Sequence, residues 1–221
     1  MLFKKLWRTM GLYRAQFISM EIMIAVGIGI FVGFNVEWVS IEKNTDAFYK
    51  ETGFADYRIT SEKGFTADDL EKIENTDGVE KASRYLSVNA DVKEKSGDAV
   101  ALTVTENSEV SGVKLISGEK YDGDDTEGVW LSDKYASANG FKLGDKITFK
   151  YKNLQIECKI KGLIKSSEYL ICVRDSSQLM PDYDTFGYAY ISPALYKKAA
   201  GTDFYPQINV ISDLDKKEFT E

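Results

Sequence analysis

Three glycines, Gly27, Gly29 and Gly33, lie in the stretch AVGIGIFVGFNVEW with the spacing G-x-G-x-x-x-G. A similar glycine string binds dinucleotide phosphates when a strand precedes it, a helix follows it and an acidic residue lies about 20 positions further on. In this sequence the third glycine is displaced by one position, and residues 17–36 are almost all apolar. The glycines therefore favour a role in helix packing over phosphate binding.

The apolar run predicts a membrane-spanning helix over residues 17–39. About 20 apolar residues cross the hydrocarbon core of a bilayer, and a spanning segment must satisfy its own backbone hydrogen bonds, which favours a helix. Gly29 and Gly33 then lie one turn apart on one face, a spacing that lets a second helix approach closely. Glu21 either faces partner helices or, if the span begins at Ile22, reaches the headgroups.

The residues flanking this run predict its orientation. Four basic residues, Lys4, Lys5, Arg8 and Arg14, precede or enter it. The positive-inside tendency places the N-terminus in the cytoplasm and the bulk of the chain outside the cell membrane, which the chain crosses once. Residues 1–16 predict an amphipathic cytoplasmic segment at the interface. The run is too long for a signal peptide and has no A-x-A-like cleavage site after it, which indicates a retained anchor.

The composition excludes several chemistries. The chain of 221 residues contains no histidine, which removes histidine-based catalysis and most zinc sites. Four of its 28 basic residues and one of its 35 acidic residues lie within residues 1–36. The rest of the chain, residues 37–221, therefore has 24 basic and 34 acidic residues. Such an acidic surface does not attract nucleic acid. No G-x-x-x-x-G-K-[ST] motif occurs. We expect no catalytic residue, no cofactor and no metal site, and hence no enzyme.

One acidic turn resembles a calcium loop in part. In YDGDDTEG, Asp122, Asp124 and Thr126 occupy ligand positions 1, 3 and 5. Position 6 is Glu127, where the loop needs glycine, and position 12 is Asp133 instead of glutamate. The turn is therefore predicted to be a solvated acidic loop.

The two cysteines, Cys158 and Cys172, are equidistant from Lys165. A hairpin turning near Lys165 would place them opposite each other, and a disulfide is compatible with an extracytoplasmic location. Two buried thiols fit equally well, because Cys158 shares a predicted strand face with Ile156 and Ile160. Both alternatives stay open at the level of the sequence.

The outer part predicts an α+β fold with two lobes. Residues 56–106 have the pattern of a strand, a helix and two strands, in which Thr66 is the predicted N-cap and Asp69 completes a capping box. Residues 192–212 add a helix and a strand, so that 56–106 and 192–212 form a split α/β sandwich lobe. Residues 107–190 predict an inserted β-rich lobe of short strands, including EYLICVR, with one helix from Ser132 to Asn139.

The aromatic stretch MPDYDTFGYAY is the strongest candidate for a partner contact. Tyr183, Phe186 and Tyr188 lie in it, and exposed tyrosine and phenylalanine are enriched at interfaces. The alternative is that these side chains belong to the core.

The order of these elements resembles the MacB/FtsX-like ABC transporter permeases, most closely the long permeases of Gram-positive bacteria. The most specific match covers Trp130 to Phe149, where the family pattern appears as Leu131-Ser132, a helix, Gly140, Leu143-Gly144-Asp145 and Ile147. The segment Asp77-Gly78-Val79 after the first outer helix is a further match. The resemblance extends over essentially the whole chain.

The resemblance implies a core domain over residues 40–221, a second permease copy and a separate ATP-binding subunit. It also implies at least three further spans, so the chain is either the first part of a longer permease or a truncated member. Family members move peptides, lipids or proteins, or control cell-wall hydrolases. The expected function is a permease component whose outer domain relays ATP-driven motion for export or mechanotransmission. The alternative is a membrane-anchored scaffold or sensor that recruits an extracellular partner such as a cell-wall hydrolase.

Overall fold

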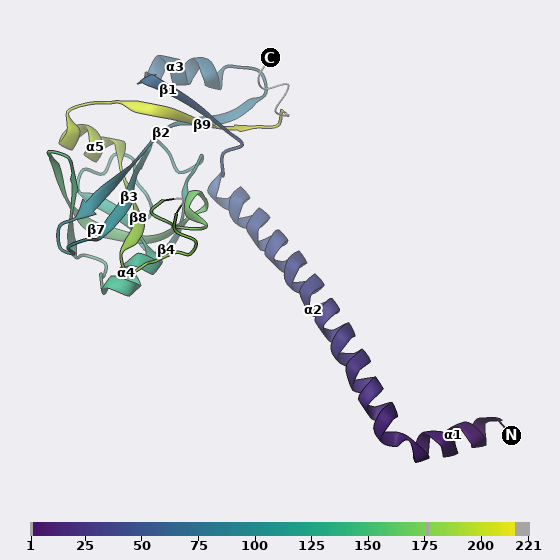
Figure 1. The fold of residues 1–221 in the computed structure, drawn as a ribbon. Helices are drawn as coiled ribbons and strands as arrows, with labels where there is room; N and C mark the ends of the chain where they lie inside the picture. Colours follow the sequence, from purple (N-terminus) through teal and green to yellow (C-terminus); the bar gives the residue numbers. More distant parts are fainter. Residues whose placement is uncertain (1, 176, 215–221) are drawn as a thin grey trace. The chain divides into compact units, whose positions relative to one another are not determined.

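The computed structural model describes residues 2–175 and 177–214, so residues 215–221 of the expected core domain, and Met1 of the expected cytoplasmic segment, lie outside it. The chain divides into two units, Met1–Ala47 and Phe48–Glu221. Its elements, labelled in Figure 1 where there is room, are α1 (Leu2–Leu12), α2 (Arg14–Thr52), β1 (Tyr57–Phe65), α3 (Ala67–Glu74), β2 (Val79–Val92), β3 (Ala99–Thr105), β4 (Val113–Gly118), β5 (Gly128–Ser132), α4 (Asp133–Asn139), β6 (Lys146–Tyr151), β7 (Leu154–Ser166), the 3-10 turn η1 (Ser167–Tyr169), β8 (Phe186–Ile191), α5 (Pro193–Ala200) and β9 (Tyr205–Ser212).

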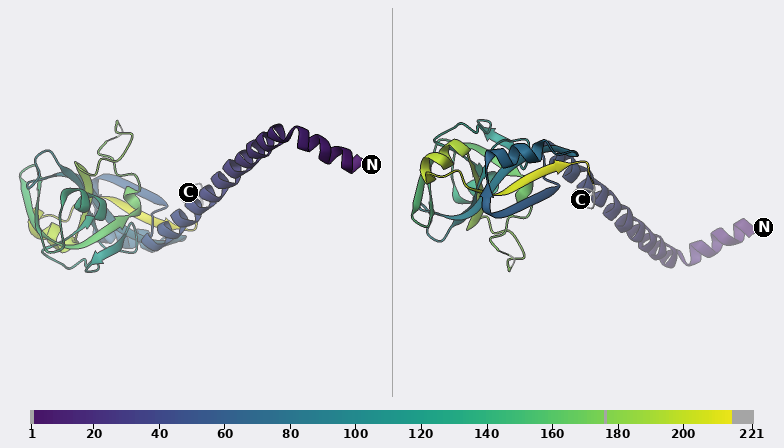
Figure 2. Two further views of the ribbon diagram at one scale, coloured as in Figure 1. Left: turned by 90° about the horizontal axis from the view of Figure 1, so that it is seen from below. Right: turned by 90° about the horizontal axis from the view of Figure 1, so that it is seen from above.

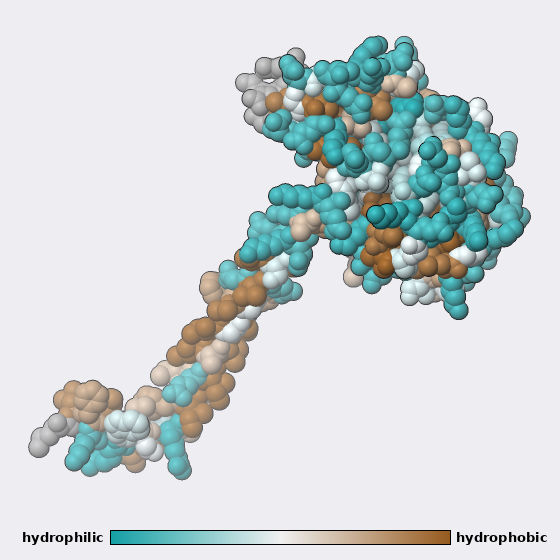
Figure 3. Space-filling model, turned by 180° about the vertical axis from the view of Figure 1, so that it is seen from behind, coloured by the Kyte–Doolittle hydropathy of each residue, from teal (hydrophilic) through white to brown (hydrophobic). Residues whose placement is uncertain are grey.

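The first unit is helical. Within the described residues, α2 is the one helix that is long and apolar enough to cross a membrane. Its apolar side chains are exposed and form a continuous brown band in Figure 3. The helix has 39 residues and continues 13 residues beyond the predicted span, to Thr52. At a rise of about 1.5 Å per residue it is roughly 58 Å long, about twice what the hydrocarbon core requires.

Six strands of the second unit close into a ring. The ladder runs from β2 to β3, β8, β5, β7 and β6, and β6 returns to β2 through the pairs Asp91↔Lys150 and Val92↔Phe149. Alternate residues point into this barrel, as expected from the two-residue period of a strand. The interior core includes Val100, Leu102 and Ile160. A closed ring leaves no unpaired edge among its own strands.

A smaller layer extends from the same sheet. The first half of β2 pairs with β9, and β9 pairs with β1, both antiparallel. Helix α3 covers this three-stranded part (Figure 1) and packs Leu70 and Ile73 against Ile208 and Val210. The predicted capping box is confirmed, since the Thr66 hydroxyl accepts from the Asp69 amide and the Asp69 carboxylate accepts from the Thr66 amide. The fold is α+β, as the sequence predicts.

Two elements belong to a different part of the fold from the one that the sequence predicts. The sequence pattern predicts both β3 and α5 as parts of the α/β lobe. In the structure β3 pairs with β8 inside the barrel, and α5 packs Leu195 and Tyr196 into the barrel core. The cause is β2, which is 14 residues long and is shared between the small layer and the barrel. Pairing partners of this kind are set by long-range contacts that no local pattern records.

One predicted strand is wrong. EYLICVR is not a strand, because Ser166 caps the 3-10 turn η1 and accepts a hydrogen bond from the Glu168 amide (3.2 Å). The chain then forms a loop up to β8. Strand β7 runs through Lys165, so no hairpin forms there. Cys158 and Cys172 are free and buried, the first in the barrel interior and the second in the cluster on its outer face.

Candidate functional site: the end of helix α2

The last turn of α2 belongs to the second unit and is bound into it. Thr52 is buried, and its hydroxyl oxygen lies 2.8 Å from the Phe48 carbonyl oxygen and 2.8 Å from the Ser167 hydroxyl oxygen. The Glu51 carboxylate forms an ion pair of 2.6 Å with Lys114 of β4. We define Thr52, Gly53, Ser111, Ser167 and Glu168 as the junction.

Gly53 ends α2 and permits a close approach of two backbones. Its φ of +60° is in the left-handed region that favours glycine. The Ser111 amide donates to the Gly53 carbonyl (2.7 Å), and the Gly112 amide donates to the Thr52 carbonyl (2.8 Å). A side chain at position 53 would place its Cβ 1.8 Å from the Glu109 carbonyl oxygen. The end of the helix is thus satisfied by the loop before β4.

Glu168 is the charged centre of the junction. Its side chain is 6% exposed and forms an ion pair of 2.6 Å with Arg58 of β1. It also accepts a hydrogen bond of 2.7 Å from the Ser111 hydroxyl, which in turn accepts one of 2.5 Å from Asn209 of β9. A carboxylate with these partners remains paired despite its burial. Through Glu168 and Ser111 the junction connects η1 with strands β1 and β9 of the small layer.

A second set of polar bonds connects η1 with the barrel. The Ser166 hydroxyl and the Tyr190 hydroxyl lie 2.8 Å apart, and the Tyr188 hydroxyl accepts from the Ser166 amide at 3.2 Å. Burial raises the pKa of Tyr190 well above its ordinary value, so its phenol is neutral. The junction therefore contacts the barrel, the small layer and the last turn of α2 at once.

The predicted contact residues lie mainly in the core. Phe186 and Tyr188 are 2% and 4% exposed and pack with Trp130 on the outer face of the barrel. This places both in the core alternative that the sequence left open. Tyr183 is half-buried in the same cluster. The sequence pattern could not separate these cases, because a buried β-strand and an exposed aromatic stretch have similar composition.

The exposed apolar residues of this region lie earlier in the loop. The loop between η1 and β8 projects from the domain (Figure 2). Within this loop Leu179 and Met180 are 94% and 76% exposed, and Leu170 and Ile171 near its start are exposed as well. Neighbouring exposed apolar residues such as Leu179 and Met180 are typical of contact surfaces.

The remaining predicted positions are either exposed on α2 or held by local contacts within the acidic turn. Glu21, Gly29 and Gly33 lie exposed on α2, and a Cβ added at either glycine would meet nothing within 4 Å. In the acidic turn, Asp122 accepts from the Asp124 amide and Asp125 is paired with Lys161. The described residues contain no group of three or more His, Cys, Asp or Glu side chains placed to hold a metal ion.

Sequence reasoning missed the junction. The helix C-terminus at Glu-Thr-Gly carried a signal, since glycine commonly follows the last turn of a helix. Nothing local marked Ser111 or Glu168, whose partners lie 98 and 110 residues away in the chain.

No family model matches the sequence, and a search of curated proteins finds no match either. Solved structures do match. The extracellular domain of the noncanonical ABC-type transporter YknZ from Gram-positive bacteria is similar with a TM-score of 0.51 and 13% identity, over 72% of this chain and 79% of that one. The periplasmic region of MacB from Actinobacillus actinomycetemcomitans is similar with a TM-score of 0.50 and 15% identity, over 73% and 71%.

The second unit has the fold of these permease domains. At such identities the likeness concerns the fold, and it confirms the resemblance that the sequence motifs indicated. An N-terminal helix with the properties of a membrane span and a domain of this permease fold are together consistent with a membrane protein that has an extracytoplasmic domain.

Proposed function

We propose that this chain supplies the first membrane helix and the extracytoplasmic domain of an ABC-type transporter permease. The observation that carries the proposal is that α2 contains the apolar run and also contributes its last turn to the junction of a domain with the permease fold. A helix that ends in this way transmits its displacement to the domain, because buried hydrogen bonds and an ion pair resist separation.

The proposal requires a second permease copy in the membrane and an ATP-binding subunit on its cytoplasmic side. A separate cytoplasmic subunit binds ATP, and its closure moves the membrane helices of two permease copies. Gly29 and Gly33 are the positions at which a second helix approaches α2, since small residues let two backbones come close in lipid. Glu21 faces such a helix or the headgroups. The outer domain then relays the motion to a protein, peptide or lipid substrate.

The orientation is tested by cysteine labelling of intact cells. We expect a membrane-impermeant maleimide to label Ser96→Cys, in the β2–β3 turn, before lysis and the matched Thr9→Cys, in α1, only after lysis. The native thiols give little background, because burial raises the pKa of Cys158 and of Cys172 to about 12 and keeps them protonated. Labelling of Thr9→Cys before lysis would contradict the orientation.

The ATP-binding partner is tested by purifying the chain from its native host. We expect a subunit with a P-loop motif to co-purify in constant ratio to this chain.

A scaffold role is the second candidate, and the exposed loop favours it. Leu179 and Met180 would contact an extracellular protein such as a cell-wall hydrolase. The double substitution Leu179→Ser/Met180→Ser should lower hydrolase capture at least tenfold in pull-down with the full chain. Leu143→Ser, at an exposed position outside the loop, is the matched control. Equal capture by both variants would exclude the loop as the contact.

A further inference from the structure

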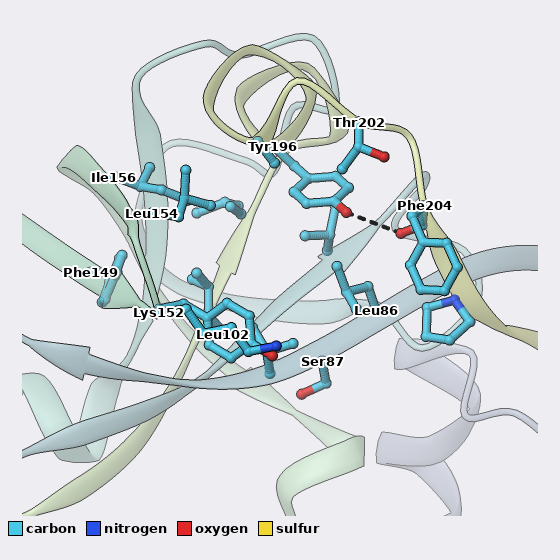
Figure 4. Close-up of a pocket in the computed structure, with 16 residues that line it drawn as sticks. Leu86, Ser87, Leu102, Phe149, Lys152, Leu154, Ile156, Tyr196, Thr202 and Phe204 are labelled. Carbon is cyan, nitrogen blue, oxygen red and sulfur yellow. Dashed lines mark hydrogen bonds between the residues drawn. The ribbon is translucent and has the colours of Figure 1, made fainter. Parts of the chain in front are cut away.

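An apolar cavity opens between the barrel and the segment that follows α5 (Figure 4). Its volume is about 490 Å³, within the range of small-molecule sites, which is about 300–1,000 Å³. Strands β2, β3, β6, β7 and β8, helix α5 and the residues before β9 surround it. The lining is mostly apolar and includes Leu86, Val88, Leu102, Phe149 and Leu154.

The polar side chains of this cavity are largely engaged. The Ser87 hydroxyl lies 2.7 Å from the Tyr169 hydroxyl, and the Tyr196 hydroxyl donates to the Phe204 carbonyl at 3.1 Å (Figure 4). A peptide bound here would bury amide groups with few partners, which costs free energy. An alkyl chain carries no such groups, so the lining favours a hydrocarbon chain.

Lys152 is the one charged residue of the lining. It lies between β6 and β7 at a φ of +52°, and its ammonium is 5.2 Å from the centre of the Tyr151 ring. Among the described residues this ammonium forms no ion pair. The outer part of the chain is acidic, so an isolated cation beside an apolar cavity selects for one negative charge next to a hydrocarbon chain.

We propose that this cavity binds a single-chain anionic amphiphile, with the chain among Leu86, Val88 and Leu154 and the anionic head at Lys152. The two parts of the ligand match the two parts of the site. The apolar surface accounts for affinity, and the cation fixes which end of the ligand remains at the mouth.

The probe is dodecanoate with a photoreactive diazirine in its chain, added to the full chain in phosphatidylcholine nanodiscs. After irradiation, peptide mass spectrometry locates the label and its dependence on probe concentration. We expect saturable labelling of peptides from β2, β7 and α5, and competition by unmodified dodecanoate. Lys152→Glu should raise the half-saturating concentration about fivefold, the size expected of a partly exposed ion pair. The matched control Lys150→Glu, on β6 and outside the lining, should leave it unchanged.

Two further arms complete the design. A diazirine alcohol of the same length should label more weakly and should not respond to Lys152→Glu. Val88→Trp, which fills the cavity, should abolish labelling while circular dichroism shows a folded domain. The proposal is overturned if no label appears in these peptides, or if Lys152→Glu and Lys150→Glu label alike. It is also overturned if a diazirine phosphatidylglycerol in the nanodisc labels the cavity in place of the free acid.

Discussion

Gly53→Ala is expected to destabilise the outer domain by roughly 3–4 kcal/mol and to release the last turn of α2 from the junction. Two costs add up. Alanine at a φ of +60° is strained, by about 1–2 kcal/mol. Its Cβ would also lie 1.8 Å from the Glu109 carbonyl oxygen. That oxygen cannot withdraw freely, because the same loop donates the Ser111 and Gly112 amides to the end of the helix.

The control for this prediction is Gly201→Ala. Gly201 has a φ of +65°, but a Cβ there would meet nothing within 4 Å. It therefore measures the backbone cost without the steric cost. In thermal melts of the detergent-solubilised chain, each kcal/mol corresponds to about 2–4 °C at this size. We expect Gly53→Ala to lower Tm by about 6–16 °C and Gly201→Ala by about a third of that. Equal shifts would show that the close approach at Gly53 does not constrain the junction.

Alkaline pH is expected to destabilise the domain as it rises from about 9 to about 11, the range in which the thiols and phenols of the unfolded chain ionise. Burial raises the pKa of several phenols, among them Tyr85, Tyr121, Tyr135, Tyr188, Tyr190 and Tyr205. It also raises the pKa of Cys158 and Cys172 to about 12. All these groups are neutral when protonated, so the folded state retains protons that the unfolded chain releases.

The sign of the effect follows from this difference. A raised folded-state pKa contributes stability that is fully present below the unfolded pKa, which is 9.0 for the thiols and 10.0 for the phenols. The contribution is lost as pH rises through the folded value. At pH 11 each buried phenol costs about 1.4 kcal/mol, one pKa unit. Several together should lower Tm by about 10 °C or more between pH 8 and pH 11.

Tyr205→Phe isolates one of these groups. The Tyr205 hydroxyl is buried and has no hydrogen-bond partner among the described residues, so its removal breaks no bond. We expect the variant to be about 1 kcal/mol more stable at pH 7, because a buried unsatisfied hydroxyl is costly. Between pH 8 and pH 11 it should lose about 1.4 kcal/mol less than the parent chain. Tyr13→Phe, which removes an exposed phenol of the other unit, is the control. Parallel pH profiles for all three proteins would contradict the assignment.

Local signals in the sequence were sufficient for most elements. The run around Gly29 and Gly33 gave the candidate span, and the Thr66–Asp69 capping box gave the start of α3. Ser132 and Gly140 gave both ends of α4. Each of these signals depends on residues within a few positions of one another, where hydropathy, capping and backbone preference act directly.

Longer-range features were only partly predictable. The strand predicted at EYLICVR is a 3-10 turn followed by a loop, since its residues serve contacts elsewhere: Glu168 with Arg58, and Tyr169 with Ser87 and Thr103. The aromatic candidates Phe186 and Tyr188 are core residues because β8 runs through the centre of the sheet, parallel to β3. Side-chain type alone does not reveal on which side of a strand the neighbours lie.

Residue type and short-range spacing are enough to predict the candidate membrane helix, the acidic α+β domain and the positions of its short helices. Three features come from long-range packing and could not be predicted in this way. Strand β2 is shared between two layers, six strands close into a barrel, and Thr52, Ser111 and Glu168 meet at the end of α2. The reason is physical: strand partners and buried ion pairs are selected by the free energy of the whole packed arrangement, over separations of about 100 residues, to which no local pattern contributes.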